Sequence, residues 1–398
     1  MFNSLLSKLK CNSKKTLLIT LFILNTINFT FAQDNIFPVD FFTKAKHAYL
    51  MDYESGEILY SKNANVPMTP SSMTKIMTTY IMFSKLKQGN LNLSDNFIVS
   101  KNASLKGGSK MFLKHNQKVS VENLLKGVIV LSGNDASITL AEGLYGSEEN
   151  FVERMNLEAK KMGLENTKFK NSTGWPDEGH VMSAKDLAIL TKNIIEKFPE
   201  YYHYHSIKDF SFNKIKQTNR NSSLGSIGVD GVKTGRTDKG GYGIVLSAQK
   251  DDRRLIAIVN GLANEKERSE EAERLLNYGF INFKNITLFS GTKEVMQAEV
   301  RYGAYNQISL EVPSKIIITV PSEYDRVKDL VFLPKLRHEI LDAPLIKGDV
   351  VGSLKITTKQ DQLLIKEVDL IIAENVKKSG IIKGFIQWVK YFVTDYLK

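Results

Sequence analysis

The chain has 398 residues, of which 42% are hydrophobic and 24% charged, a balance typical of globular proteins rather than disordered ones. Its length is sufficient for two domains with separate cores. The net charge of +11 would suit an anionic membrane surface as well as nucleic acid, but we find no nucleic-acid-binding motif and expect no nucleic-acid partner.

Residues 1–32 have the pattern of a secretory signal peptide. This segment carries four lysines and no acidic residue, followed by an apolar run from Leu17 to Phe31 and a small-residue cleavage site at Ala32. The run contains Asn25 and is short for a membrane span, which favours cleavage over an uncleaved anchor. The only cysteine, Cys11, lies within residues 1–32, so we expect the exported chain to have no disulfide and no thiolate chemistry.

A helix is expected to begin at Thr69–Pro70, with Thr69 as N-cap and Pro70 at the first helical position. Ser72 and Lys75 are three residues apart and would share one face of this helix. A serine in the first turn can act as nucleophile, and a lysine beside it can accept the proton if its pKa lies well below 10.4.

The remaining pattern places strands on either side of a helical block. Residues 47–60 are expected to form a hairpin, 120–197 to be mostly helical, 231–262 to form three strands, and 269–278 a closing helix. The individual helices are predicted at 121–131, 136–145, 150–162 and 184–197. Both strand groups would join one antiparallel sheet and the helices a second lobe, with the active site between them.

A second, smaller unit follows the catalytic region. Short alternating stretches predict an all-β domain at 291–375, after a catalytic domain at 33–290. Residues 381–398 divide into an apolar and a polar half of a helical wheel, so residues 376–398 are expected to anchor the chain in a membrane interface. The alternative is a terminal helix packed against the β domain.

Three short motifs occur in a defined order. They are Ser72-x-x-Lys75 at a helix start, Ser132-Gly133-Asn134 between two helices, and Lys233-Thr234-Gly235 on a strand. Ser-x-x-Lys and Ser-x-Asn each recur elsewhere in the chain, so the information lies in the ordered set. That set matches the serine acyl-transfer pattern of penicillin-binding proteins and class A β-lactamases.

Amide cleavage by a serine needs a nucleophile, a base, a proton path to the leaving amine and oxyanion donors. Ser132 is a candidate proton relay, and Asn134 could hydrogen-bond the substrate amide. Lys233 and Thr234 would bind a substrate carboxylate, and Lys233 would disfavour a charged Lys75 by repulsion. Gly235 would let the backbone approach the ligand.

The sequence around these motifs resembles the low-molecular-mass penicillin-binding proteins that are D-alanyl-D-alanine carboxypeptidases, the serine peptidase family S11. The resemblance rests on the stretches 70–78, 107–142, 163–190 and 229–262 and continues through the β domain and tail. It implies a β-lactamase/transpeptidase-like α+β fold and a serine enzyme that removes the terminal D-alanine from peptidoglycan stem pentapeptides through an acyl-enzyme. It also implies inhibition by β-lactams and a location in the periplasm, on the outer face of the inner membrane.

The resemblance suggests further site residues. The second oxyanion N–H would come from Arg236, at a position where relatives often carry histidine. Arg220 and Arg268 fall where relatives have arginines near the cleft, although both could equally be solvated surface charges. Glu148 and Glu149 are interpreted as a charge pair at a helix N-terminus.

Several alternatives remain on the sequence alone. A class A β-lactamase would need a deacylating glutamate, and residues 166–175 contain no acid. DD-endopeptidase cleavage would use the same site, and a non-catalytic penicillin-binding scaffold would keep the motifs. The histidines are scattered, with His203-x-His205 the only close pair, so we expect no metal and no other cofactor.

Overall fold

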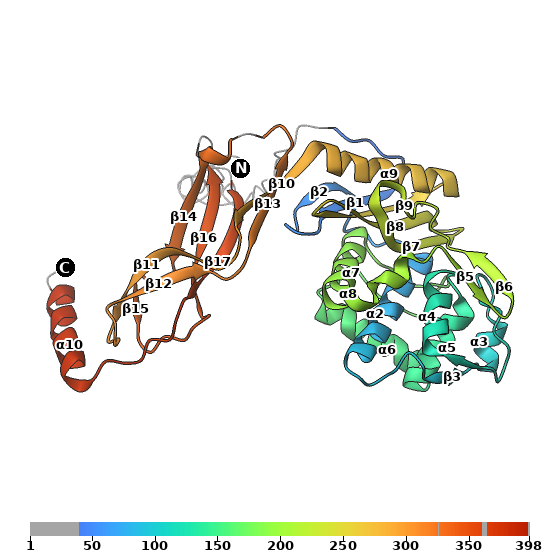
Figure 1. Ribbon diagram of the computed structural model, residues 1–398, viewed down its shortest axis with the longest axis horizontal. Helices are drawn as coiled ribbons and strands as arrows, with labels where there is room; N and C mark the ends of the chain where they lie inside the picture. The colour runs from blue at the N-terminus through green and yellow to red at the C-terminus, as the bar shows by residue number, and fades with distance from the viewer. Residues whose placement is uncertain (1–39, 325, 360–363, 397–398) are drawn as a thin grey trace, which may run out of the picture. The chain divides into compact units, whose positions relative to one another are not determined.

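The computed structural model describes residues 40–324, 326–359 and 364–396 (Figure 1). The predicted signal peptide and its cleavage site lie outside these residues. Among the described residues, no helix is both long and apolar enough to cross a membrane.

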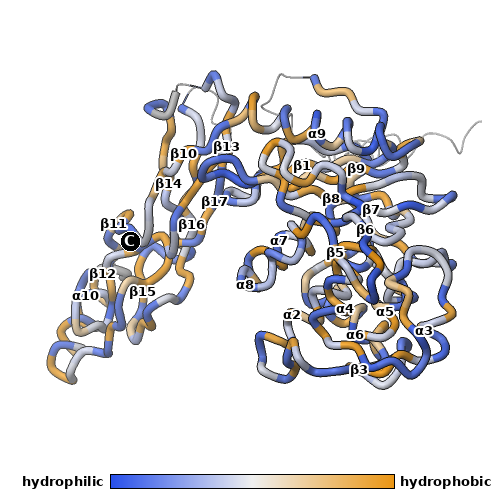
Figure 2. Tube along the Cα trace, turned by 45° about the vertical axis from the view of Figure 1, so that its right-hand side comes forward, coloured by the Kyte–Doolittle hydropathy of each residue, from blue (hydrophilic) through white to orange (hydrophobic). Residues whose placement is uncertain are grey.

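The catalytic lobe is built on a five-stranded antiparallel sheet with the order β2-β1-β9-β8-β7. Its strands are β1 His47–Asp52, β2 Ile58–Lys62, β7 Val229–Thr237, β8 Gly241–Lys250 and β9 Arg253–Leu262. β1 pairs directly with β9, so the N-terminal hairpin and the later strands meet as predicted. β8 and β9 are almost continuously apolar and buried, because both faces of the sheet are covered (Figure 2).

Helices cover the two faces of this sheet. α9 lies on one face and α7 on the other, and the remaining helices continue the second lobe beyond α7 (Figure 1). The helices are α2 Lys75–Lys87, α3 Lys101–Leu105, α4 Val121–Ile129, α5 Asn134–Tyr145, α6 Glu148–Lys161, α7 Ala184–Lys197, α8 Pro199–Tyr202 and α9 Glu265–Asn282. Two small hairpins complete the lobe, formed by β3 Asn96–Ile98 with β4 Lys118–Ser120 and β5 Asp209–Phe212 with β6 Ile215–Thr218.

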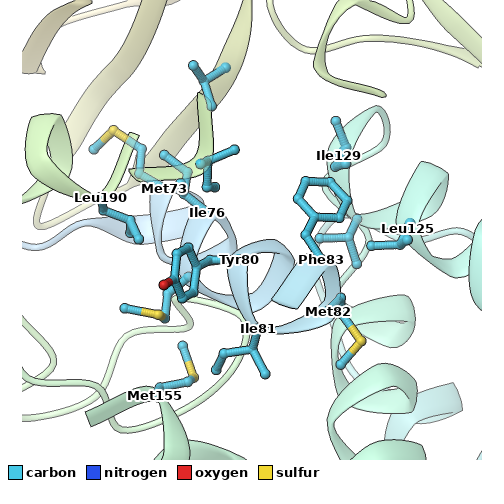
Figure 3. Packing of buried hydrophobic residues seen from close by; sticks show 14 of the residues in the cluster. Met73, Ile76, Tyr80, Ile81, Met82, Phe83, Leu125, Ile129, Met155 and Leu190 are labelled. Carbon is cyan, nitrogen blue, oxygen red and sulfur yellow. The ribbon is translucent and has the colours of Figure 1, made fainter. Parts of the chain in front are cut away.

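α2 forms the centre of the helical lobe. Ten of its thirteen residues are buried, and they are apolar or small on nearly every side. Ile76, Tyr80, Ile81 and Phe83 point into surrounding helices (Figure 3). Each such side chain contributes about 1.5–3 kcal/mol when buried. This packing fixes the helix that carries Lys75 at its first residue.

The start of this helix differs from the prediction. Thr69 does not cap it: residues Ser71–Thr74 form a 3-10 turn, Pro70 stands at the N-cap without a side-chain hydrogen bond, and the α-helix begins only at Lys75. Ser71 has φ +50°, in the left-handed region. The glycines at 174 and 235 bring neighbouring backbone against Ser71 and Pro70, so tertiary contacts rather than a local cap set this turn.

Other boundaries shifted by smaller amounts. α9 starts at Glu265, four residues earlier than predicted, because the Asn264 side chain accepts a hydrogen bond from the Glu267 N–H and caps it. α5 starts at Asn134, which places this motif residue in the first helical turn. The β5–β6 hairpin was not predicted, since its short strands are mostly exposed and polar.

The β domain contains a two-stranded pair, β10-β13, and a six-stranded sheet with the order β14-β16-β17-β12-β11-β15. Its strands are β10 Phe283–Phe289, β11 Lys293–Arg301, β12 Gln307–Val312, β13 Ile316–Pro321, β14 Leu330–Leu336, β15 Ile340–Asp342, β16 Val350–Thr358 and β17 Leu364–Ile372. β10 pairs with β13, so strand pairing of this domain begins before residue 291. The chain ends in α10, Ile381–Tyr396.

Candidate active site

Ser72 and Lys75 are adjacent at the junction of the 3-10 turn and α2. Lys75 Nζ lies 3.1 Å from Ser72 Oγ. Ser72 lines a cleft, whereas Lys75 is fully buried beneath it. The serine is therefore open to a ligand and the lysine is shielded from water, as a nucleophile and its base require.

Lys75 Nζ has two further partners, both acceptors. It donates to the side-chain oxygen of Asn134 at 2.7 Å and to the backbone carbonyl of Thr173 at 2.6 Å. Burial and the positive charge of Lys233 hold the pKa of Lys75 well below its ordinary value, against smaller opposing effects of Asp135 and Glu148. This shift favours the neutral amine, the form that can accept a proton.

Ser132, which also lines the cleft, is hydrogen-bonded to Lys233. Lys233 Nζ donates to Ser132 Oγ at 2.9 Å and to the Thr234 carbonyl at 3.2 Å. Ser132 has φ +59°, an uncommon backbone conformation for a residue with a side chain, and it lies in the turn between α4 and α5. The described contacts thus couple Ser132 to Lys233, and not directly to Lys75 as a simple relay would require.

Lys233 is itself a buried amine with a perturbed pKa. Burial, followed by the nearby Arg268 and Arg220, lowers its pKa to about 7. Its side chain therefore changes charge close to physiological pH, and a bound carboxylate would favour the cationic form.

Asn134, which we expect to hydrogen-bond the substrate amide, has protein partners at both ends of its side chain. Its oxygen accepts from Lys75, and its Nδ2 donates to the Gly107 carbonyl at 2.8 Å. The bond to a carbonyl fixes which end of the amide faces the lysine. Asn134 still lines the cleft, but in this structure both ends of its amide are engaged with protein groups.

Strand β7 runs along one wall of the cleft and contributes Thr234, Gly235 and Arg236 to it. A Cβ on Gly235 would lie 2.8 Å from the Pro70 carbonyl, so glycine is needed here for the strand to approach the Ser72 turn. The Arg236 guanidinium lies 5.2 Å from the centre of the Tyr242 ring, which also lines the cleft.

Arg220 and Arg268 both line the same cleft. Arg268 is 3% exposed and donates to the Arg220 carbonyl and to Glu265, so the interpretation as a solvated surface charge is wrong for this residue. Arg220 is exposed and donates to the Gln217 side chain.

A loop at residues 171–175 closes the other wall, and sequence reasoning gave it no role. Asn171 Oδ1 accepts from the backbone N–H groups of Thr173, Gly174 and Trp175. This arrangement holds the loop in a tight turn and directs the Thr173 carbonyl at Lys75. Backbone carbonyls occur at every residue, so no residue type could have signalled this contact.

Two buried groups hold the parts around the loop in place. Asp135 accepts from the backbone N–H groups of Met111 and Leu113, which fixes the segment at residues 111–113. His180 Nδ1 accepts from the Lys170 N–H, which places its proton on Nε2 and directs it at Thr74 Oγ1, 2.8 Å away. Burial lowers the pKa of His180 to about 4, so it remains neutral at physiological pH.

The cleft between these walls has a volume of about 550 Å³. Its lining includes the following residues: Ser72, Gly108, Ser109, Ser132, Asn134, Thr173, Gly174, Trp175, Pro176, Arg220, Thr234, Gly235, Arg236, Thr237, Asp238, Tyr242, Glu265 and Arg268. Eight of the ten predicted site residues thus belong to this lining. Of the other two, Lys233 is bonded to Ser132 in the lining, and Lys75 lies buried below it. Across the described part of the chain, His, Cys, Asp and Glu form no group of three or more that could hold a metal ion.

Residues 37–264 match the profile of the Peptidase S11 family, described as D-alanyl-D-alanine carboxypeptidase. The chain belongs to this family. Residues 283–378 match the C-terminal domain of penicillin-binding protein 5, which agrees with the early start of the β domain at β10.

Individual members of the S11 family are similar over most of the chain. The D-alanyl-D-alanine carboxypeptidase DacA of Haemophilus influenzae is 39% identical over 346 residues, covering 85% of this chain and 87% of the relative. The structure of penicillin-binding protein 5 from Haemophilus influenzae superimposes with a TM-score of 0.81 at 38% identity, covering 85% of this chain and 99% of that one. The cefotaxime-bound penicillin-binding protein D2 of Listeria monocytogenes aligns with a TM-score of 0.57 at 30% identity, over 61% of this chain and 99% of that one.

Proposed function

We propose that this S11 carboxypeptidase removes the terminal D-alanine of peptidoglycan stem pentapeptides, with Ser72 as the acyl-ester nucleophile. The observation that carries the assignment is the 3.1 Å contact between Ser72 Oγ and the buried amine of Lys75, at the base of the cleft. Lys75 takes the hydroxyl proton as Ser72 Oγ forms a bond to the carbonyl carbon of the penultimate D-alanine. The tetrahedral intermediate then collapses, the C–N bond breaks, and the terminal D-alanine leaves once its nitrogen has been protonated.

Ser132 and Lys233 supply that proton and hold the substrate carboxylate. Ser132 Oγ is in contact with Lys233 and lines the cleft, so it can deliver a proton to the leaving nitrogen and be resupplied through Lys233 or, once substrate is bound, Lys75. Thr234 and Arg268 line the cleft and Lys233 is bonded to Ser132 in its lining, so positive charge and a hydroxyl are available for the free carboxylate of a terminal D-alanine.

The oxyanion is proposed to lie between the backbone N–H groups of Ser72 and Arg236. Ser72 lies in the 3-10 turn, and Gly235 brings β7 close to this turn. Removing one such donor costs about 2.7–4 kcal/mol of transition-state stabilisation in serine enzymes. Water then hydrolyses the acyl-enzyme and regenerates Ser72. β-Lactams would acylate the same hydroxyl, in keeping with the cefotaxime-bound relative.

We propose that the enzyme acts outside the cytoplasm, with α10 in the membrane interface. The helix turns Gln387 and Tyr391 toward the β domain, where they bond to Asn306 and Glu299. Its apolar side chains remain exposed, and they include the following: Ile381, Ile382, Phe385, Ile386, Trp388, Val389, Phe392 and Val393. Such a face, on a helix too short to span, suits the boundary between lipid headgroups and acyl chains. The predicted signal peptide supports an exported location.

The decisive experiment is D-alanine release from a soluble N-acetylated peptide ending in D-Ala-D-Ala, with Ser72→Ala beside the wild type. We expect release by the wild type and none above background by the variant, together with loss of the covalent penicillin adduct. Adduct formation without release would favour DD-endopeptidase specificity. A folded wild type that gives neither product nor adduct would leave the scaffold alternative.

A further inference from the structure

Glu148 has a role that its position at a helix start does not explain. It is the first residue of α6, and its Oε1 accepts two hydrogen bonds from Ser172, from the backbone N–H at 2.9 Å and from the hydroxyl at 2.6 Å. The neighbouring Glu149 is exposed in the same helical turn. The two acids are therefore not an equivalent charge pair, because only Glu148 reaches the loop that forms the cleft wall.

Ser172 is held from the opposite side by α2. Its carbonyl accepts a 2.7 Å hydrogen bond from Thr78 Oγ1, and the residue is fully buried. Each polar group of Ser172 thus has a partner on α2 or α6, and its backbone is fixed between two packed helices. A carboxylate oxygen that accepts two hydrogen bonds, as Glu148 Oε1 does, is a stronger anchor than a neutral acceptor.

The residue after Ser172 contacts the proposed base. The Thr173 carbonyl accepts from Lys75 Nζ at 2.6 Å, and Asn134 Oδ1 accepts at 2.7 Å. Both oxygens can only accept, so both N–H bonds of a neutral amine are directed at them. Ser72 is the remaining partner of Nζ, and its hydroxyl can donate. The lone pair of the neutral amine is consequently left facing the Ser72 proton.

We propose that Glu148 is a positioning residue for the general base. Through Ser172 it holds the Thr173 carbonyl at Lys75 Nζ, and this contact, with Asn134, directs the amine lone pair at Ser72 Oγ. Glu148 is not part of the cleft lining, and no proton transfer is assigned to it. This inference rests on the roles proposed for Ser72 and Lys75.

The charge of Glu148 adds a second, separable effect. The charged or titratable groups that face Lys75 come from five segments: Lys233 of β7, Lys106 after α3, Asp135 of α5, His180 of the 171–182 segment, and Glu148 of α6. Burial, Lys233 and Lys106 lower the pKa of Lys75, whereas Asp135 and Glu148 raise it. Loss of the Glu148 charge should therefore lower the pKa of Lys75 further.

Two substitutions separate the anchor from the charge. In Glu148→Gln the amide oxygen can still accept both hydrogen bonds from Ser172 but carries no charge, whereas Glu148→Ala removes both. We expect Glu148→Ala to acylate with a fluorescent penicillin roughly 10- to 100-fold more slowly, the loss expected from a misplaced catalytic group. Glu148→Gln should acylate at a rate within about twofold of wild type at pH above the acid limb, since the loop stays in place. The acid limb of the rate–pH profile should move to lower pH in both variants.

Glu149→Ala is the matched control, because it removes a charge from the same helical turn without touching the loop. It should retain the wild-type rate and pH limb. Ser172→Ala keeps the N–H bond to Glu148 but loses the hydroxyl bond, so its acylation rate should lie between those of wild type and Glu148→Ala. If Glu148→Ala does not fold, Ser172→Ala takes its place in the comparison. Equal slowing of Glu148→Gln and Glu148→Ala, or wild-type acylation by folded Glu148→Ala, would overturn the positioning role. A wild type without any adduct would overturn the proposed function together with it.

Discussion

Lys75 and Lys233 are two buried amines that need opposite charge states in the proposed mechanism. Lys75 must be neutral to accept a proton, and Lys233 must be a cation to hold a carboxylate. Burial lowers the pKa of both amines; the charge of Lys233 lowers the pKa of Lys75 further, and Arg268 and Arg220 lower that of Lys233. Lys75 is wholly enclosed, whereas Lys233 reaches the cleft through Ser132. A substrate carboxylate in that cleft would favour charge on Lys233, and the resulting repulsion would keep Lys75 neutral.

This division of charge predicts the alkaline side of the pH profile. The pKa of Lys233 is lowered to about 7, so its cation is present below that pH and is lost as the pH rises through it. For an N-acetylated peptide, kcat/KM should therefore fall above about pH 7, approaching tenfold per pH unit. Lys233→Arg keeps its charge throughout this range and should give a flat profile above pH 7, even if its absolute rate is lower. Parallel profiles for the two proteins would show that Lys233 does not carry this limb.

At the scale of single elements, the 3-10 turn at Ser71–Thr74 is held by close backbone contacts. Gly174 has φ +78°, and a Cβ there would lie 1.8 Å from the Ser71 carbonyl oxygen, which is far inside any permitted contact. The loop carrying Thr173 and the turn carrying Ser72 are thus packed backbone to backbone. Glycine is needed at 174 for two reasons: its backbone is left-handed, and there is no space for a Cβ beside Ser71.

Two glycine substitutions separate the effect of the close contact at Gly174 from the effect of its left-handed backbone conformation. Gly163 also has positive φ, +70°, but a Cβ there would meet nothing within 4 Å. Gly163→Ala should lose about 1–2 kcal/mol of unfolding free energy from the left-handed backbone alone. Gly174→Ala should lose about 1–3 kcal/mol more, because the overpacked loop must move. It should also slow penicillin acylation, which Gly163→Ala should not. Chemical unfolding and acylation rates measure the two effects, and equal unfolding losses would contradict the packing argument.

The same elements show how far the sequence could lead. Ser72, Lys75, Ser132 and Lys233 could be predicted because their chemistry depends on side-chain type, and the structure brings them to one cleft. The antiparallel sheet could be predicted because apolar strand patterns flank the helical block. The capping role of Thr69 was wrong because contacts with distant glycines override the local preference. Glu148 was interpreted as a helix-end charge since its partner, the Ser172 N–H, depends on how a loop 24 residues away folds back.

At the scale of the whole molecule, the described residues of the β domain and α10 contribute nothing to the cleft lining. Gln387, Tyr391 and Lys383 bond to β-domain residues, with Lys383 donating to the Ala304 carbonyl. One face of the helix therefore packs on the β domain, as one of the two alternatives from the sequence expected. The apolar face remains exposed, which the proposed membrane contact requires.

Exposed aromatic residues on α10 therefore provide the last test. Phe385 is 64% and Trp388 49% exposed, on the face away from the β domain. Burial of one such side chain contributes about 1.5–3 kcal/mol, so Phe385→Asn with Trp388→Asn should weaken binding to phosphatidylglycerol–phosphatidylcholine vesicles at least tenfold in sedimentation. A chain ending at residue 375 should not bind. Tyr391→Phe removes only the hydroxyl bond to Glu299 and should bind like wild type. D-alanine release from soluble peptide should be unchanged in all of these variants, because the cleft lining contains none of the altered residues. Undiminished binding by the truncated chain would show that α10 is not the anchor and that the affinity lies elsewhere on the molecule.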